Sequence, residues 1–264
     1  TAELAQLSGW MAYDLGLYGV AQRYYLLALH ACREGSCPDL GAKVIGDMTH
    51  MSIALGQHEQ AQALARTALY SLPRHASSLV RSDLLGLESR ASSRLGANEA
   101  GNTDRSAQTC LAVWEEGPGH DPAPDWIHYM SQAQVDGHAA DAYIDLALSV
   151  SGNSQRYHYA AKAEVHSLRA RRARGDAYVR SRVIDEIRLA RVRLAQGDPA
   201  ESAAVGTYAL RLAAGTRSAM VLTRLTGFSR ELSTRYPGAS DTGSFHEELR
   251  DYLRKAAPAR VTEP

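Results

Sequence analysis

The sequence predicts an all-α protein built as a solenoid of antiparallel helix hairpins. Apolar and small residues recur at helical spacing along most of the chain, and no segment has the alternation typical of a strand. A Leu-Gly pair stands at residues 15–16 and returns at 55–56 and 95–96, forty residues apart each time. Helix pairs that repeat at about this period and bury their apolar faces only against their neighbours define an α-solenoid.

The first hairpin is predicted over residues 2–35. Its first helix ends at Gly16, and we expect its core face to be formed by Leu4, Leu7, Met11 and Leu15. The second helix carries a face of the same kind, formed by Val20, Ala21, Tyr24, Leu27 and Ala28. Two amphipathic helices joined by a short turn make an antiparallel pair.

Two further hairpins follow at residues 39–74 and 76–116. In the first two hairpins an alanine stands twelve residues after the glycine, at 28 and 68, and the same distance separates Gly197 from Ala209. Small side chains at such positions let two helices approach closely. The sequence therefore predicts tight contacts within each hairpin at these alanines.

The second half of the chain continues the pattern with less regular spacing. The proline- and glycine-rich segment 115–124 cannot continue a helix, and Asp125 can cap a helix running from Trp126 to about residue 150. We predict hairpins over 125–174 and 176–215, the latter with its second helix opened by Asp198 and Pro199. Helices over 217–257 complete a single solenoid domain spanning residues 1–264.

The composition limits the classes of binding partner and the cellular compartment that we expect for this protein. The formal net charge is zero and the pI is about 7.1, so nothing calls for nucleic acid or an anionic membrane surface. The chain has no apolar run of the roughly 20 residues that a membrane helix needs. Cys32, Cys37 and Cys110 lack the second pair of a zinc site, so we expect reduced thiols, no metal and a cytoplasmic protein.

A ligand site is predicted on the concave surface. In the first helix a second stripe lies about 100° from the predicted core face, and the forty-residue period extends this stripe to Lys43 and then to Asp83. The predicted ligand-binding residues are Trp10, Tyr13, Asp14, His50, Arg90 and Arg94, with Trp126 and Tyr129 facing them from the other side. The arginines could hold a carboxylate or phosphate while the aromatic rings supply buried area. The alternative is that these aromatic side chains only pack between hairpins.

Motifs of catalysis are missing from the sequence. None of the ten histidines has the spacing of a metal site, and no phosphate-binding loop or nucleophile elbow is present. Asp14 with His50 is the one acid-base pair that could be suggested. We therefore assign no catalytic residue and expect no cofactor.

The run from residue 15 to residue 29, LGLYGVAQRYYLLAL, resembles the tetratricopeptide repeat. The matching positions are Gly16, Tyr18, Ala21, Tyr25, Ala28 and Leu29, and the second hairpin keeps Gly56, Ala61, Ala68, Leu69 and Pro73. This resemblance implies a right-handed solenoid.

Longer segments resemble the C-terminal regions of XRE-type helix-turn-helix transcriptional regulators of high-GC Gram-positive bacteria. They comprise residues 3–29, 47–56, 121–137 and 193–219, of which GWMAYD at 9–14 is the most telling. In that family an N-terminal DNA-reading domain precedes the repeats, and because the sequence here starts at Thr1 inside a predicted helix, we expect that such a domain has been removed. Family members usually carry an acidic pair after the Trp-x-x-Tyr element, whereas this chain has SQAQ at 131–134.

The resemblance implies a ligand-sensing and self-associating module of a transcriptional regulator. We expect a small-molecule or peptide effector in the concave groove, a homodimer, and contact with DNA only through the missing domain. Two alternatives remain open at this point. One is a free-standing scaffold that binds a peptide or helix of another protein, and the other is an enzyme that uses Asp14 and His50.

Overall fold

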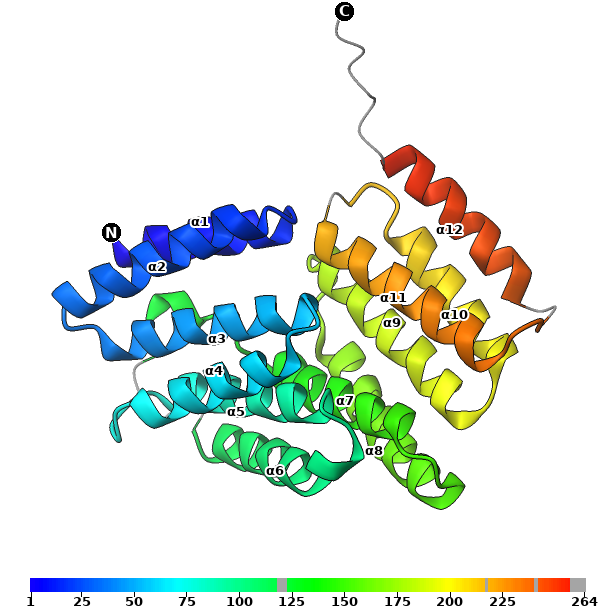
Figure 1. Ribbon diagram of the computed structural model, residues 1–264, viewed down its shortest axis with the longest axis horizontal. Helices are drawn as coiled ribbons and strands as arrows, with labels where there is room; N and C mark the ends of the chain where they lie inside the picture. Colours follow the sequence, from blue (N-terminus) through cyan, green and yellow to red (C-terminus); the bar gives the residue numbers. More distant parts are fainter. Residues whose placement is uncertain (118–122, 217, 240–241, 257–264) are drawn as a thin grey trace, which may run out of the picture. The chain divides into compact units, whose positions relative to one another are not determined.

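The computed structural model describes residues 1–117, 123–216, 218–239 and 242–256. These residues form twelve α-helices and two short 3-10 helices, with no strand among them, which confirms the all-α prediction (Figure 1). The chain divides into two compact units, Thr1–Arg174 and Gly175–Pro264, and each is described by itself.

The first unit is a succession of stacked helix pairs. Its elements are α1 (Ala2–Asp14), α2 (Tyr18–Glu34), α3 (Pro38–Ala54), α4 (His58–Ser71), α5 (Ser78–Ser93), η1 (Ala97–Glu99), α6 (Ala100–Glu116), η2 (Asp125–Ile127), α7 (Gln132–Ser149) and α8 (Asn153–Ala173). Each odd-numbered helix packs on the even-numbered helix that follows it, and that helix packs on the next odd-numbered one. This arrangement is consistent with a solenoid (Figure 1).

The repeated Leu-Gly pairs mark the turns inside the first three hairpins. Gly16, Gly56 and Gly96 have φ angles of 77°, 74° and 93°. An L-residue with a side chain rarely adopts this left-handed conformation, whereas glycine does so without steric cost. The Leu-Gly pair that returns every forty residues therefore marks the turn between the two helices of each hairpin.

Small residues make the close contacts within the hairpins, as predicted. Ala28 and Ala68 are completely buried. A Cβ atom on Gly9 of α1 would lie 2.6 Å from ring atoms of Tyr25 in α2, so the two helices meet at a distance that only glycine allows.

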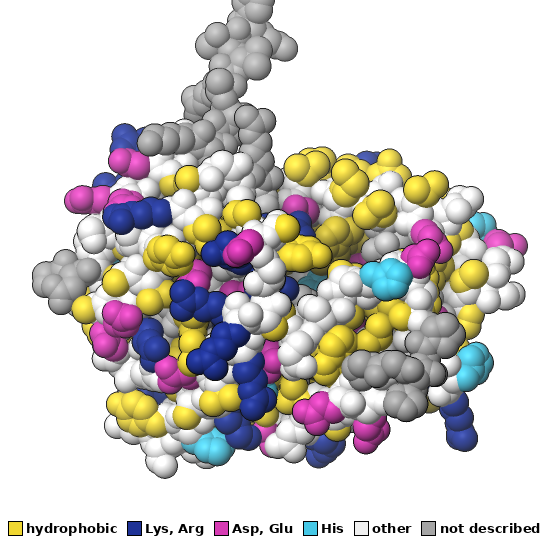
Figure 2. Space-filling model, turned by 180° about the vertical axis from the view of Figure 1, so that it is seen from behind, with side chains coloured by type: hydrophobic (Ala, Val, Ile, Leu, Met, Phe, Trp, Pro, Cys, Tyr) yellow, Lys and Arg dark blue, Asp and Glu magenta, His cyan; other side chains and the backbone are white. Residues whose placement is uncertain are grey.

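The predicted core face of α1 is wrong. Leu4, Leu7, Met11 and Leu15 expose 70%, 51%, 59% and 60% of their surface, and on α2 Tyr24 and Leu27 are also exposed. The buried face of α1 instead consists of Ala5, Gly9, Ala12 and Tyr13. The error came from assigning the core to the largest side chains, whereas α1 packs through small residues and an aromatic ring. Figure 2 shows hydrophobic side chains gathered at its upper right, where α1 and α2 lie.

The helix predicted to begin at Trp126 begins later. Asp125–Ile127 form a 3-10 turn, and α7 starts at Gln132. Ile127 and Met130 are buried in the core cluster of α4 and α5, so the segment packs as a short connection and does not extend the helix. Residues 118–122 of the predicted break lie outside the described residues.

The second unit contains α9 (Val179–Gln196), α10 (Pro199–Leu212), α11 (Ala219–Arg235) and α12 (Gly243–Ala256). The predicted cap of α10 is confirmed, because the Asp198 carboxylate accepts a hydrogen bond of 2.9 Å from the backbone N–H of Glu201. The core centres on Phe228 and Phe245, whose rings meet edge to face at 5.1 Å. Residues 217 and 257, the ends of the predicted C-terminal helices, lie outside the described residues.

Candidate functional site

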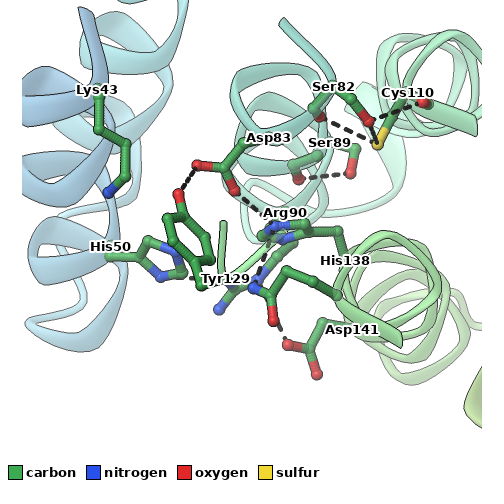
Figure 3. A network of polar contacts seen from close by, with 12 residues as sticks. Lys43, His50, Ser82, Asp83, Ser89, Arg90, Cys110, Tyr129, His138 and Asp141 are labelled. Carbon is green, nitrogen blue, oxygen red and sulfur yellow. Dashed lines mark hydrogen bonds and ion pairs between the residues drawn. The ribbon is translucent and has the colours of Figure 1, made fainter. Parts of the chain in front are cut away.

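Charged and aromatic side chains meet between the odd-numbered helices of the first unit. Figure 3 shows residues of α3, α5 and α7 pointing toward one another, with the Tyr129 side chain between them. We call this group the polar network; it comprises Gln6, Trp10, Lys43, Asp47, His50, Asp83, Arg90, Tyr129, His138 and Asp141. The helical period and the forty-residue repeat together bring these positions to one side of the stacked hairpins.

One end of the polar network lies between α1 and α3. Asp47 is completely buried, forms an ion pair with Lys43, and accepts a hydrogen bond of 2.6 Å from the Gln6 side-chain amide. The Lys43 ammonium lies 5.7 Å from the centre of the Trp10 ring and 5.0 Å from that of Tyr129. Burial raises the pKa of Asp47 although Lys43 opposes the change. The lysine is thus held by a carboxylate and two aromatic rings.

Asp83 of α5 forms the centre of the polar network. Its carboxylate accepts a hydrogen bond of 2.5 Å from the Tyr129 hydroxyl and lies 3.1 Å from Nε2 of His138. Burial disfavours the charged form, but the His138 contact and the nearby Lys43 hold the pKa of Asp83 below its ordinary value. Burial and the Asp83 charge raise the pKa of Tyr129, so this hydroxyl remains a donor.

The ring of Tyr129 forms an exposed edge of the polar network. Tyr129 exposes 45% of its surface although its hydroxyl reaches the buried Asp83. The other side chains around Asp83 are far less accessible, with Lys43 at 5% and His138 at 1%. A molecule approaching the network from solvent would therefore meet this ring.

A glycine positions the His138 ring. A Cβ atom on Gly86 would lie 2.6 Å from the imidazole, so the ring rests directly on the backbone of α5. Gly46 occupies the position forty residues earlier and receives Leu84 in the same way, at 2.9 Å. The close approach brings His138 within hydrogen-bonding distance of Asp83.

The other end of the polar network joins α3, α5 and α7 through Arg90. Its guanidinium lies 3.2 Å from Nδ1 of His50 and 3.4 Å from the Asp141 carboxylate. Burial and the positive charge of Arg90 lower the pKa of His50 well below its ordinary value. Because a guanidinium only donates hydrogen bonds, Nδ1 of the neutral imidazole is the acceptor.

The structure brings five of the eight predicted site residues together. Trp10 and His50 pack edge to face at 5.5 Å, and the group also includes Tyr13, Arg90 and Tyr129. Tyr13 lies beside Trp10 and donates a long hydrogen bond of 3.5 Å to the backbone carbonyl of His50.

The remaining three predicted residues lie at or beyond the edge of the polar network. Arg94, which directly follows α5, pairs with Asp145 of α7 at 2.7 Å, one turn beyond the pair of Arg90 and Asp141. Asp14 is the last residue of α1 and is half-buried. Trp126 packs against the core cluster of α4 and α5 and lines a separate cavity of about 300 Å³ beside Cys37 and His75.

Sequence reasoning missed the contribution of α7. His138 and Asp141 lie more than forty residues beyond their partners on α5, because the connection before α7 breaks the repeat. A signal for them was present, since polar residues recur at helical spacing in an otherwise apolar helix; they are Gln134, His138, Asp141 and Asp145.

A second polar cluster fastens α6, α7 and α8 together. Asp104 accepts hydrogen bonds of 2.7 Å from the Tyr143 hydroxyl and from Lys162. The Tyr143 ring stacks on His166, which lies 2.7 Å from the Asp136 carboxylate. These contacts link three helices of the first unit and have a structural explanation.

Neither the described residues nor comparison with known proteins adds a cofactor or a family. Among the described residues, no cluster of three or more His, Cys, Asp and Glu side chains could hold a metal ion, and none of the helices has the length and apolarity needed to cross a membrane. Comparisons with models of known families, with curated proteins and with solved structures find no match. The chemistry available at the polar network is recognition of a polar molecule by charged and aromatic groups.

Proposed function

We propose that the first unit is the ligand-sensing module of a bacterial transcriptional regulator and that it binds an acidic small molecule or peptide at the polar network. The burial of so many charges between hairpins is the main support. An apolar cluster of the same volume would stabilise a helical stack as well or better, because the attraction between buried charges does little more than offset the free energy of removing them from water. Stability alone therefore does not account for this choice of residues.

The effector would bind by exchanging with a carboxylate of the protein. Arg90 already pairs with a carboxylate, that of Asp141, at 3.4 Å, and its guanidinium could pair with an effector's carboxylate or phosphate in its place. Tyr129 provides the exposed edge, and the Trp10 ring lies behind it across Lys43. An acidic group entering beside Tyr129 would displace Asp141 and keep Arg90 neutralised.

This exchange would also provide the switch. The ion pair between Arg90 and Asp141 links α5 to α7, while Lys43 and Asp47 link α3 to α1 through Gln6. Replacing one of these links by an effector would favour a different angle between neighbouring hairpins, to the extent that the effector binds the two arrangements unequally. In a self-associating regulator, the changed angle would move the attached DNA-reading domains.

Native mass spectrometry of the purified chain, before and after denaturation, tests the proposal by revealing a co-purified molecule. Thermal shift assays with a panel of carboxylated and phosphorylated metabolites extend the search. We expect a retained acidic compound or a metabolite that raises the melting temperature. That response should disappear in Arg90→Gln and weaken in Tyr129→Phe, which keeps the ring and loses the hydrogen bond to Asp83.

The matched control is Arg105→Gln, which removes an exposed arginine on α6. Circular dichroism establishes that each variant retains its helical content. A ligand response that survives in Arg90→Gln would contradict the proposed site, and the absence of any passenger or response across the panel would contradict the proposed function.

A further inference from the structure

The outer face of the first hairpin is apolar and uncovered. Four large aliphatic side chains of α1 and of the residue directly after it are each at least half exposed, and we call them the α1 stripe: Leu4, Leu7, Met11 and Leu15. They recur at intervals of three and four residues, so they lie along one face of the helix. Hydrophobic side chains are visible over this region in Figure 2. A contiguous apolar surface of this kind marks an interaction site.

The repeat register identifies what kind of element this face accommodates. Forty residues after Leu4 and Met11 stand Val44 and Met51, which are 0% and 6% exposed. Eighty residues after Leu4, Leu7 and Met11 stand three residues that are completely buried; they are Leu84, Leu87 and Ala91.

In both later hairpins this position faces a helix. Both helices of the preceding hairpin pack there: α1 and α2 pack on α3, and α3 and α4 pack on α5, where a Cβ atom on Gly46 of α3 would lie 2.9 Å from Leu84. Leu84 and Leu87 share a core cluster with Ala68 and Leu72, the latter directly after the last residue of α4. Leu4, Leu7 and Met11 therefore occupy the same packing surface without its covering hairpin, whereas the equivalent of Leu15, Leu55, is 42% exposed within the stack.

The same hairpin presents a second exposed stripe that could cover it. Leu17, Tyr24 and Leu27 expose 52%, 39% and 49% of their surface, with the half-buried Val20 between them. These positions follow the three- and four-residue spacing of a helix that packs against another helix. We call Leu17, Val20, Tyr24 and Leu27 the α2 stripe.

We propose that this face is a two-fold interface between two copies of the chain, in which the α1 stripe of each copy packs on the α2 stripe of the other. An isologous interface must be self-complementary, and this hairpin carries both surfaces. The seven large side chains of the two stripes that expose 39% to 70% of their surface would form the apolar centre of such an interface, which in a standard complex buries about 800 Å² per partner.

The charges of the two helices are also complementary. The α1 helix carries Glu3 and Asp14 and no basic residue, whereas α2 carries Arg23 and Arg33 against Glu34. Packing α1 on the partner's α2 brings a helix with two acidic residues against a helix with two arginines, which favours this pairing over α1 on α1. The interface deepens the proposed function by supplying self-association, but it shares no residue with the polar network.

Light scattering and analytical ultracentrifugation of the full chain over a concentration series test the interface. The fraction of dimer should increase with the concentration of the chain, because dimer formation follows mass action. We expect the dimer to predominate at about 50 µM. The double variant Leu7→Glu and Met11→Glu should weaken dimerisation by more than about a hundredfold, since charges would replace the centre of the buried stripe. Tyr70→Glu is the matched control, because Tyr70 of α4 is 94% exposed and lies outside both stripes. It should leave the dimer unchanged.

Disulfide trapping tests which helices meet. In a Cys37→Ser background, which removes the exposed thiol, Met11→Cys is mixed with Tyr24→Cys and oxidised. We expect the covalent heterodimer to form in large excess over that formed with Tyr70→Cys. A monomeric parent chain, a dimer that survives the double glutamate change, or trapping no better than the control would each overturn the interface. None of these results bears on effector binding, so the two proposals fail separately.

Discussion

Two glycines, one in each unit, receive an aromatic ring in the same way. A Cβ on Gly86 would lie 2.6 Å from the His138 imidazole, and a Cβ on Gly206 would lie 2.5 Å from the Phe228 ring. In the second unit the ring is apolar and meets Phe245. In the first unit the ring is polar and meets the Asp83 carboxylate.

The difference separates packing from chemistry. Glycine allows a ring to rest on a helix backbone whatever the nature of the ring. An apolar ring then gains stability directly from burial, whereas a buried imidazole needs a partner to offset its desolvation. His138 obtains that partner only because Asp83 and Lys43 are buried with it and the Tyr129 hydroxyl donates a hydrogen bond to Asp83. A fold that needed only stability would use the arrangement of the second unit in both places.

The largest expected effect is the loss of the apolar ring. Phe228→Ala should lower the free energy of unfolding of the second unit by about 4 kcal/mol, because it removes a buried ring and leaves a cavity beside Phe245. Chemical denaturation followed by circular dichroism measures the change. Tyr208→Ala, at a half-exposed position on α10, is the control and should cost much less. Equal losses in the two variants would mean that the aromatic pair does not anchor this unit.

Removing the centre of the polar network should have the next largest effect. Asp83→Ala takes the acceptor away from the Tyr129 hydroxyl and from His138, and we expect a loss of about 3 kcal/mol in unfolding free energy. Asp125→Ala, which removes a fully exposed carboxylate, should change little.

The apolar replacement of the same centre sharpens the test of the comparison. The triple variant Asp83→Leu, His138→Leu and Tyr129→Phe replaces the central groups together, and buried ion pairs replaced in this way often lose no stability. We expect it to be more stable than Asp83→Ala and to lose the effector response. A triple variant less stable than Asp83→Ala would show that the charges serve stability after all.

A smaller effect is expected from adding a methyl group to each of the two glycines on which the rings rest. Gly86→Ala and Gly206→Ala should each cost about 2 kcal/mol, because the new methyl group forces the ring or the helix to shift. Gly227→Ala on α11 is the control, since a Cβ there meets nothing within 4 Å. It should be neutral or stabilising, because alanine favours helix more than glycine does. Thermal unfolding of the three variants gives the comparison, and a neutral Gly86→Ala would contradict the close approach of His138.

Much of the first unit could be predicted from the sequence, because its repeat is regular. The spacing of Gly16, Gly56 and Gly96 located the turns, and the forty-residue period placed Trp10, His50 and Arg90 together. Both predictions rest on local geometry that the chain repeats.

The sequence could not be read where the repeat is interrupted or ends. The connection before α7 changes the register, so His138 and Asp141 could not be reached by adding forty residues. The α1 stripe was mistaken for core because hydrophobicity identifies a face that packs but not what packs against it. The equivalent residues Val44 and Leu84 are buried because a preceding hairpin covers them.

The smallest expected effect is a difference in pH dependence between the two units. His50 and His246 both have pKa values lowered by burial and a neighbouring arginine, Arg90 for His50 and Arg250 for His246, and His50 is shifted further. Below about pH 6.5 these histidines take up protons more readily in the unfolded chain than in the folded chain, so each histidine makes the free energy of unfolding fall as the pH decreases.

Replacing His50 should therefore flatten this fall more than replacing His246. His50→Gln should recover about 1 kcal/mol of the stability lost between about pH 6.5 and pH 5, measured against the parent chain by urea denaturation. Around His50, Arg90, Lys43 and His138 oppose its protonation while Asp83 favours it. His246→Gln, at a half-buried site with two serine contacts, should recover less. If both variants follow the parent profile, His50 is protonated as readily in the folded chain as in the unfolded chain, and Arg90 does not hold it neutral. A flattened profile for His50 alone would mean that the guanidinium is committed to the imidazole and to Asp141, which is the arrangement an acidic effector would have to disrupt.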